Sequence, residues 1–482
     1  MIATPQNGGT PKNSANLQKG RNILKNPNNK PCYKLTPAQA VAYFQCQFSL
    51  YKRVINILAS ITISEKVDYD TLNKAYQLLV ERNDALRLKF FKKKGQLMQY
   101  FDDYDPKKIK KIPEYSFATE KEQDKFINKV RNGHIKFMSG VVIEPYFIHT
   151  FDGRDMIFLK VCHLALDIYG LKNMFTDLLD IYNALKDGTE LPAPMAKYED
   201  VVKRDHENTD NQEAYNKHAD FFKDMLHNQP EPYYAGIHGP KNKTWQKQLE
   251  KHKHCMPLII FNNQTKTYTH KIDRHTTERI IFYCRHNQCS PANLLFYTCS
   301  LTQALLNGRL KNLMPIGLYD CRVTAAEKSC GGSKAQSAGC YTKINYAKSF
   351  DENLRAFSGD QLKLYRHVKF PDVDFETLVH NAYRTSPLDM YYSLAYSLIY
   401  FDIPEGIELN VYSNGRGALP AYVVQFLNSK TNEIEMAYDV QTKTTSEEDV
   451  RVFHGYYLNV LNQVLDDPHI VVGDITLTPN ES

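Results

Sequence analysis

The sequence predicts an α+β protein, a mixed α/β sandwich in which each half of the chain contains both strands and helices. Short apolar runs such as residues 86–91 and 156–161 are typical of strands. Residues 171–185 instead repeat apolar side chains at helical spacing. The chain has 482 residues, of which 42% are hydrophobic and 12% aromatic, and this is enough to form sizeable cores. We therefore expect two folded halves of roughly 200 residues each.

The first half is expected to begin after a polar tail. Residues 1–30 are rich in Asn, Gly, Lys and Pro, so they bury little apolar surface and are expected to be disordered. Thr36 and Pro37 then start a helix, because threonine caps a helix and proline fits its first turn. The other elements of this half are a helix over 70–81, strands over 86–91, 141–151 and 156–161, and the helix over 171–185, which ends at Gly188.

A charged segment, residues 205–223, is expected to be helical and to cross between the two halves. The second half then mixes strands and helices again. Its strands are predicted over 268–272, 314–319, 407–411, 422–426 and 434–438, and its helices over 278–286, 291–306 and 447–465. The expected division is therefore an N-terminal lobe over residues 31–205 and a C-terminal lobe over residues 206–482.

Charge and cysteine content argue against several classes of protein. The net charge is only +6, and no aromatic and basic stripe accompanies the lysine runs at 92–94 and 107–111, so nucleic acid is not an expected partner. Those runs are either solvated loops or a landing patch for a phosphate or an acidic carrier protein. The ten cysteines are scattered without a CxxC pair, which argues against a zinc or thioredoxin-type site and fits a reducing compartment.

The sequence also contains no apolar stretch of the ~18 residues that a membrane span needs. The N-terminus lacks the apolar segment of a signal peptide, so we expect a cytoplasmic protein. No ligand cluster predicts a metal ion or a permanently bound cofactor.

One short segment, residues 161–170, contains residues suited to catalysis. It follows a predicted strand and precedes the helix over 171–185, and clefts form where strands end in open sheets. His163 is suited to act as a general base because the ordinary pKa of histidine lies near neutrality. Asp167, four residues on, is placed to orient the loop. A second HxxxD pattern, His206 to Asp210, has no strand before it and is interpreted as chance.

Six segments together resemble the signature motifs of one family of enzymes. They are Thr36 to Gln39 (SxAQ), Arg82 to Phe90 (RHExLRTxF), Cys162 to Ile168 (HHxxxDG), Tyr198 to Val202 (YxDxAxW), Gly317 to Arg322 with Gly339 to Thr342 (GxFVNT), and Asn414 to Pro420 (a looser RNPL match). They occur in the family's order and span about residues 33–478. The chain thus resembles the condensation domains of nonribosomal peptide synthetases, enzymes of secondary metabolism, and the related chloramphenicol-acetyltransferase-like acyltransferases.

This resemblance implies a fold and a mechanism. The family has two chloramphenicol-acetyltransferase-like lobes arranged in a V, with the active site in a tunnel between them. An acyl thioester, on the phosphopantetheine of a carrier protein or on coenzyme A, meets an amine or alcohol there. By resemblance, His163 is the general base, and Asp167 forms a structural salt bridge with Arg322 of the second lobe. The family also implies a monomer, and since no further synthetase domain follows in the sequence, we expect a stand-alone enzyme.

The chain departs from the family pattern in the catalytic segment and at one later position. Cys162 replaces the first, structural histidine, for which a small buried residue is a plausible substitute. Ile168 replaces a glycine, and we expect its β-branched side chain to resist unusual backbone angles and to narrow the channel, while Gly170 restores flexibility. Lys343 stands where the family usually has Asn. These changes count against peptide-bond formation more than against acyl transfer.

Two alternatives to amide formation by a carrier-dependent enzyme stay open. One is a coenzyme A-dependent ester synthase that makes wax esters or acylates glycolipids or other alcohols. The other is a catalytically inactive binding or scaffold protein with the same fold, for which Ile168 is the main argument.

Overall fold

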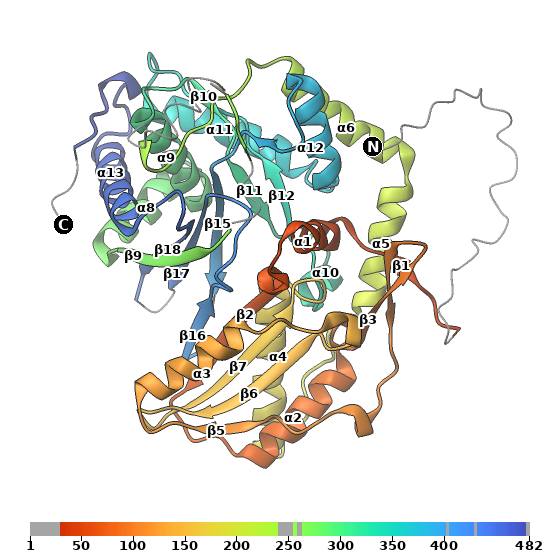
Figure 1. Ribbon diagram of the computed structural model, residues 1–482. Helices are drawn as coiled ribbons and strands as arrows, with labels where there is room; N and C mark the ends of the chain where they lie inside the picture. Colours follow the sequence, from red (N-terminus) through yellow and green to blue (C-terminus); the bar gives the residue numbers. More distant parts are fainter. Residues whose placement is uncertain (1–28, 240–253, 258–262, 402–403, 429–430, 479–482) are drawn as a thin grey trace, which may run out of the picture.

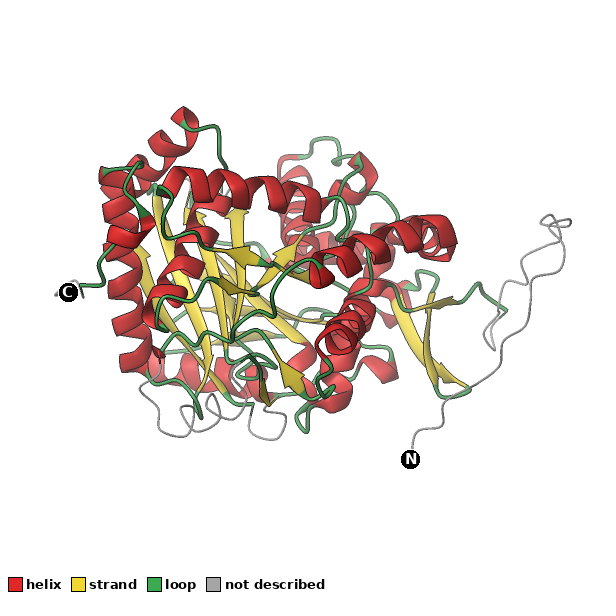
Figure 2. Ribbon diagram, turned by 90° about the horizontal axis from the view of Figure 1, so that it is seen from above, coloured by secondary structure: helices red, strands yellow, loops and turns green. Residues whose placement is uncertain are grey.

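The computed structural model describes residues 29–239, 254–257, 263–401, 404–428 and 431–478, and it contains two α+β lobes (Figure 1). All but the last two residues of the predicted tail at 1–30 lie outside this range. Each lobe is built around one main sheet, so the predicted α+β class is confirmed. Seen from above, helices lie around the outside of the strands (Figure 2).

The first lobe has a five-stranded sheet with helices on both faces. Its strand order is β16-β2-β7-β6-β5. Helices α2 and α4 pack on one face, and α3 packs on the other against Leu58 and Phe158. The bounds are α1 Pro37–Phe48, β2 Asn56–Ile63, α2 Tyr69–Arg82, β5 Glu114–Ser116, α3 Glu120–Asn132, β6 Ile143–His149, β7 Asp155–Cys162, α4 Ile168–Asp187 and β16 Ile407–Tyr412. Because both faces are covered, all eight residues of the central strand β7 are buried.

Strand β16 corrects the expected division of the chain at residue 205. It comes from the second half of the sequence but pairs antiparallel with β2 of the first lobe, with Ile407 opposite Ile63. In Figure 1 it lies below the strands of the upper lobe, at the edge of the lower sheet. Ile407 and Leu409 pack there against the first lobe's core. The segment 206–482 therefore does not form one self-contained lobe, because it supplies an edge strand to the other.

The second lobe has a six-stranded sheet of order β12-β11-β15-β17-β18-β9. Helix α9 is buried continuously from Leu294 to Leu305 because the sheet, α11 and α13 surround it. Its buried hydroxyls donate to carbonyls one turn earlier, as Thr298 does to Leu294. The bounds are β9 Thr265–Ile272, α8 Arg274–His286, α9 Pro291–Leu306, β11 Ile316–Tyr319, β12 Gln336–Gly339, α11 Phe350–Tyr365, α12 Asp372–Tyr383, β15 Leu394–Phe401, β17 Ala421–Asn428, β18 Glu433–Gln441 and α13 Glu447–Asp466.

The connection between the lobes consists of two helices, α5 (Tyr198–Asp210) and α6 (Gln212–His227), along one side of the molecule (Figure 1). The prediction of one helix over 205–223 was therefore wrong in two respects. The helix starts earlier because Tyr198, Val201 and Val202 form a buried face. It breaks at Asn211, whose side chain accepts from the N–H of Ala214 and caps a new helix.

Three small sheets and a short helix complete the structure. The three-stranded sheet has the order β1-β4-β3, and its β3–β4 hairpin carries the lysine run 92–94 at its turn. The bounds are β1 Tyr33–Lys34, β3 Leu88–Lys93, β4 Gln96–Phe101, β8 Met256–Pro257, β10 Asn312–Leu313, α10 Ala325–Ser329, β13 Thr342–Lys343 and β14 Asp389–Met390. The predicted strand over 86–91 begins two residues later, because Asp84–Arg87 forms a 3₁₀ turn.

Candidate active site

His163 lies immediately after strand β7, in a tight turn that leads to helix α4. Its backbone N–H donates to the carbonyl of Ile55 at 2.8 Å, so the turn is joined to the residue directly before the neighbouring strand β2. The N–H groups of Ala165 and Leu166 both donate to the carbonyl of Cys162, which closes the turn. The position of the His163 backbone is therefore fixed by the end of the central strand β7 and by Ile55 directly before β2.

The His163 imidazole is half-buried, and its Nδ1 atom is buried without a hydrogen-bond partner among the described residues. Burial lowers the pKa of His163, and its own backbone and the negative charge of Asp167 oppose this only in part. The ring is consequently neutral at pH 7 and can accept a proton. A neutral, partly accessible imidazole at the end of a strand has the properties of a general base.

Gln39 supports the turn from helix α1. Its amide donates to the carbonyl of Leu164 at 2.7 Å, and it exchanges hydrogen bonds with the amide of Gln99. Gln39 also accepts from the backbone N–H of Thr36, as the second half of the capping box that starts α1. The segment Thr36 to Gln39 therefore contributes a contact to the turn that carries His163, a role that the sequence alone did not assign.

Asp167 caps helix α4 and lies at the centre of a buried ion pair. Its Oδ1 accepts from the N–H of Gly170 at 2.7 Å. Arg322 donates to both carboxylate oxygens at 2.9 Å, and both side chains are at most 2% exposed. Burial raises the pKa of Asp167, but Arg322 and the N–H donors outweigh it and hold that pKa below its usual range. The structure thus contains the ion pair that the resemblance implied.

A loop of the second lobe, residues 330–335, wraps around this carboxylate. The N–H groups of Lys334 and Ala335 donate to its Oδ2 at 2.7 and 2.8 Å, and the N–H of Asp167 donates to the carbonyl of Gly332. A Cβ atom at Gly332, where φ is +90°, would lie 2.1 Å from the ring of Tyr198. Only glycine fits there. This loop was not predicted from the sequence, where the adjacent pair Gly331-Gly332 is the available signal for it.

Two expectations about the backbone of residues 162–170 were wrong. Gly170 does not supply flexibility: it is the third residue of α4, and a Cβ atom there would lie 2.5 Å from the carbonyl oxygen of Gly332. Glycine is needed at this position because the loop approaches so closely. Ile168 is the first residue of the same helix and is not among the residues with positive φ, so a β-branched residue is tolerated there. Cys162, in contrast, is fully buried as expected.

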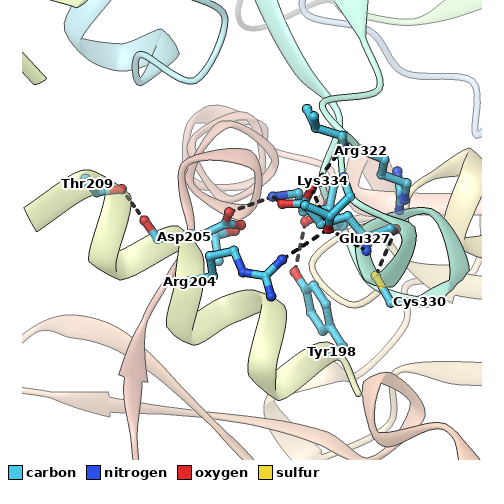
Figure 3. A network of polar contacts seen from close by, with 12 residues as sticks. Tyr198, Arg204, Asp205, Thr209, Arg322, Glu327, Cys330 and Lys334 are labelled. Atoms are coloured by element: carbon cyan, nitrogen blue, oxygen red, sulfur yellow. Dashed lines mark hydrogen bonds and ion pairs between the residues drawn. The ribbon is translucent and has the colours of Figure 1, made fainter. Parts of the chain in front are cut away.

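The loop is held to the linking helix by charged side chains (Figure 3). Buried Lys334 donates to Asp205 of α5 at 2.6 Å and pairs with Glu327 at 3.4 Å. Thr324 and Lys334 help to lower the pKa of Glu327 to about 2 although burial raises it. Tyr198 donates its hydroxyl to the carbonyl of Ser333 at 2.9 Å. Helix α5 therefore fixes the loop that in turn holds Asp167.

The motif at Arg82 to Phe90 also has a structural role. Asp84 accepts from the N–H groups of Tyr198 and Glu199 at 2.8 and 2.9 Å and so satisfies the first turn of α5. The segment is thereby connected to the loop at 330–335 through Tyr198. The second HxxxD copy lies on α5, where His206 contacts the carbonyl of Lys34, and Lys343 is exposed on β13.

Within the described ranges, no three His, Cys, Asp or Glu side chains gather as a metal site would require. None of the helices seen in the structure is both long and apolar enough to span a bilayer. A pocket of about 90 Å³ between α5, α6 and residues 334–336 does not include His163. The tunnel implied by the resemblance stays a prediction.

Comparisons with known proteins agree on one family. A subunit of plipastatin synthase from Bacillus subtilis (strain 168) is 21% identical over 468 residues, which cover 92% of this chain and 17% of that protein. A subunit of surfactin synthase from the same organism is 21% identical over 474 residues, which cover 92% of this chain and 12% of that protein. The chain thus spans less than a fifth of each of these relatives.

Solved structures have the same fold. The first condensation domain of the calcium-dependent antibiotic synthetase, in complex with a substrate analogue, matches with a TM-score of 0.77, 13% identity, and coverage of 93% and 99% of the two chains. A mutant starter condensation domain of rhizomide synthetase in complex with C8-CoA matches at 0.77 and 12% identity, covering 93% of this chain and 97% of that one. The X-domain from teicoplanin biosynthesis matches at 0.72 and 14%, with coverage of 92% and 97%.

A family model described as "Condensation domain" matches residues 29–278. This match includes the turn with His163, Asp167 and helix α4 that the structure places against the second lobe. It covers more than half of the 482 residues, and the chain therefore belongs to the condensation domain family.

Proposed function

We propose that this protein is an acyltransferase in which His163 acts as general base. It would condense an acyl or aminoacyl thioester, bound to a carrier protein or to coenzyme A, with an amine or alcohol. The observation that carries the proposal is the half-buried, neutral imidazole of His163 on a turn fixed by β2, α1 and the Asp167–Arg322 pair.

The geometry supports this role for His163 and a positioning role for its neighbours. Both oxygens of the Asp167 carboxylate are engaged by backbone N–H groups and Arg322, so this group is held away from proton transfer. Arg322 also has both terminal nitrogens engaged. His163 would take the proton from the nucleophile as it attacks the thioester carbonyl, a contribution of roughly 100- to 10,000-fold to the rate.

The acyl donor is proposed from the relatives. The rhizomide starter domain has been solved with C8-CoA, and also with C8-CoA together with Leu-SNAC. A thioester donor on coenzyme A is therefore compatible with this fold. The ester-forming alternative shares the same base and donor, and it differs only in the nucleophile.

The test is acyl transfer followed by mass spectrometry. Acyl-coenzyme A and acyl-carrier thioesters are offered with a panel of amines and alcohols to wild type, His163→Ala and His206→Ala. His206 is the matched control, since it belongs to the HxxxD pattern on α5, outside the catalytic turn. We expect product with wild type and His206→Ala, and a loss of roughly 100-fold or more with His163→Ala.

The pH dependence has a defined sign. Because the pKa of His163 lies below 6.5, activity should stay constant from pH 7 downwards until below 6.5 and then fall as the ring takes up a proton. Equal product with wild type and His163→Ala, when both are folded, would contradict the proposed base. Binding of acyl thioesters without transfer to any nucleophile would instead favour the inactive binding protein.

A further inference from the structure

Three arginines from different parts of the chain meet where the lobes join. Arg53 lies in the 3₁₀ turn Lys52–Ile55, Arg131 in the last turn of α3, and Arg416 in the segment after β16. Since β16 runs antiparallel to β2, its continuation passes the start of β2. Asn414 holds it there by donating to the carbonyls of Val54 and Asn56 at 3.1 and 3.0 Å.

Side-chain contacts bring the guanidinium groups of Arg53 and Arg416 together at Tyr51, and Arg131 lies near enough for its charge to act on Arg53. Arg53 donates to the side chain of Asn132, the neighbour of Arg131, at 2.5 Å. The guanidinium carbons of Arg416 and Arg53 lie 3.5 and 5.7 Å from the ring centre of Tyr51. A Cβ atom at Gly415 would lie 3.8 Å from Arg53 Nη2, with no closer neighbour, so the space beside this guanidinium is open.

These arginines lack the partners that the buried arginine of the active site has. Arg322 pairs with two carboxylates, whereas Arg53, Arg131 and Arg416 form no ion pair with any described residue. Each of the three is half-buried, and each has a buried Nε atom without a hydrogen-bond partner in the part of the chain that the structure describes. Arg322 shares this last feature, so the missing carboxylates are what distinguish the three arginines from it. Buried donors without an acceptor and adjacent like charges both cost free energy, and an anionic ligand would reduce both costs.

The electrostatics of the patch agree with this geometry. Burial lowers the pKa of Arg53, and the charges of Arg416 and Arg131 lower it further. The carboxylate that Arg131 influences is Asp439, but that group is half-buried and accepts from Thr267 at 2.9 Å. Burial raises the pKa of Asp439, and a single such carboxylate leaves most of the positive charge of three arginines uncompensated.

We propose that Arg53, Arg131 and Arg416 form an oxyanion site that binds the phosphate of the acyl donor's pantetheine arm. Guanidinium groups bind phosphate oxygens in a bidentate manner, and three of them from three segments suit a tetrahedral oxyanion. The site lies near the catalytic turn along the chain, because Arg53 is two residues from Ile55, whose carbonyl accepts from the N–H of His163. The assignment to the donor rests on the proposed acyl transfer.

The test measures the affinity for a series of ligands by isothermal titration calorimetry. Coenzyme A and phosphopantetheine contain the phosphate, pantetheine lacks it, and inorganic phosphate lacks the arm. The variants are Arg131→Gln, Arg416→Gln and Arg416→Lys, and Arg355→Gln is the control because Arg355 is exposed and paired with Asp351. We expect wild type and the control to bind phosphopantetheine about tenfold or more tighter than pantetheine, and the Gln variants to lose that difference.

Thermal unfolding without ligand provides an independent readout. Removing one of three repelling charges should leave the melting temperature of the free protein unchanged or raise it. The increase in melting temperature that coenzyme A causes should be smaller in the Gln variants than in wild type. Equal affinity of wild type for pantetheine and phosphopantetheine would overturn the site. Inorganic phosphate that binds as tightly as phosphopantetheine would overturn the assignment to the donor.

The His163→Ala protein separates this proposal from the proposed function. It keeps all three arginines, so it should bind phosphopantetheine as wild type does even though transfer is lost. Loss of the ligand preference in the Gln variants together with an unimpaired His163-dependent activity at saturating donor would support both. If acyl transfer does not depend on His163 but the preference for phosphopantetheine over pantetheine is kept, only the proposed role of His163 as base is refuted.

Discussion

Replacement of Asp167 by Asn tests the buried ion pair that joins the lobes. The two carboxylate oxygens accept from five donors: Gly170, Lys334 and Ala335 through their N–H groups, and Arg322 twice. An asparagine amide has one oxygen only. If that oxygen takes the Oδ2 position, where three donors converge, the N–H of Gly170 and one Arg322 nitrogen lose their acceptor, and the positive charge loses its buried partner.

The cost follows from these contacts. Removing one partner of a buried ion pair typically destabilises a protein by about 3–5 kcal/mol. Arg322 retains Asp320, whose carboxylate lies 2.5 Å away and is 28% exposed, so we expect the lower end, about 3 kcal/mol. Folded domains have total stabilities of about 5–15 kcal/mol, so the variant should still fold at 25 °C.

The assay is urea unfolding of wild type, Asp167→Asn, Asp320→Asn and the combined variant Asp167→Asn with Arg322→Met. Asp320→Asn is the matched control, because it removes the more exposed of the two carboxylates that Arg322 contacts. The combined variant should be less destabilised than Asp167→Asn alone would suggest for a lost pair, since neither charge of the fully buried Asp167–Arg322 pair is left without the other. A cost below about 1 kcal/mol for Asp167→Asn, or one equal to that of Asp320→Asn, would refute the reasoning.

A kinetic readout separates positioning from mere stability. The charge of Asp167 raises the pKa of His163, although burial has the larger and opposite effect. In Asp167→Asn that contribution is gone, so the acid limb of the pH–rate profile should shift to lower pH. A purely structural role for Asp167 would lower the amount of folded enzyme and leave the limb where it is in wild type.

Two further predictions concern the same turn and the second lobe's core. Gly170→Ala should destabilise the protein by about 1–3 kcal/mol, because its Cβ atom would meet the backbone of Gly332. Gly359→Ala lies on α11, where a Cβ atom has nothing within 4 Å, and should stabilise by up to about 1 kcal/mol. Equal free energies of unfolding in urea for the two variants would contradict this prediction. Burial and the charge of His270 lower the pKa of His454 from 6.5 to about 4, which at ~1.36 kcal/mol per unit amounts to about 3 kcal/mol. Between pH 6.5 and 4, His454 is protonated in the unfolded chain and neutral in the folded protein, so the free energy of unfolding should fall as pH drops through this range and level off below it. His454→Gln should show a smaller fall than wild type. The control His227→Gln, at an exposed position, should behave as wild type does.

Much of the first lobe could be predicted because local patterns and tertiary structure agree there. The helix over 70–81 is α2 within one residue at each end, and in the second lobe the helix expected over 291–306 coincides with α9. Capping residues identify such starts: Ser290 caps α9 through Asn293, as Thr36 caps α1. The place of His163 between a strand and a helix could be predicted for the same reason, while its catalytic role stays a prediction.

Long-range pairing explains what the sequence could not predict. Strand β16 has an ordinary strand pattern, but nothing local indicates that it pairs with β2, over 340 residues earlier in the chain. The donors that surround Asp167 come from a loop whose N–H groups carry no sequence signal at all. Arg416 was noted only as part of a loose motif, and its proximity to Arg53 and Arg131 depends on that same unpredicted pairing.

The geometry explains why isoleucine is tolerated at position 168, where the family has glycine. A glycine matters where the backbone adopts a left-handed conformation or where another chain segment approaches too closely for a Cβ atom. In this protein those conditions hold at Gly332 and Gly170, and residue 168 starts a regular helix and packs its side chain on the first lobe's core. The tight contact between the lobes is therefore preserved without glycine at 168. Ile168 therefore gives no backbone argument for an inactive protein, and the proposal of catalysis rests on His163.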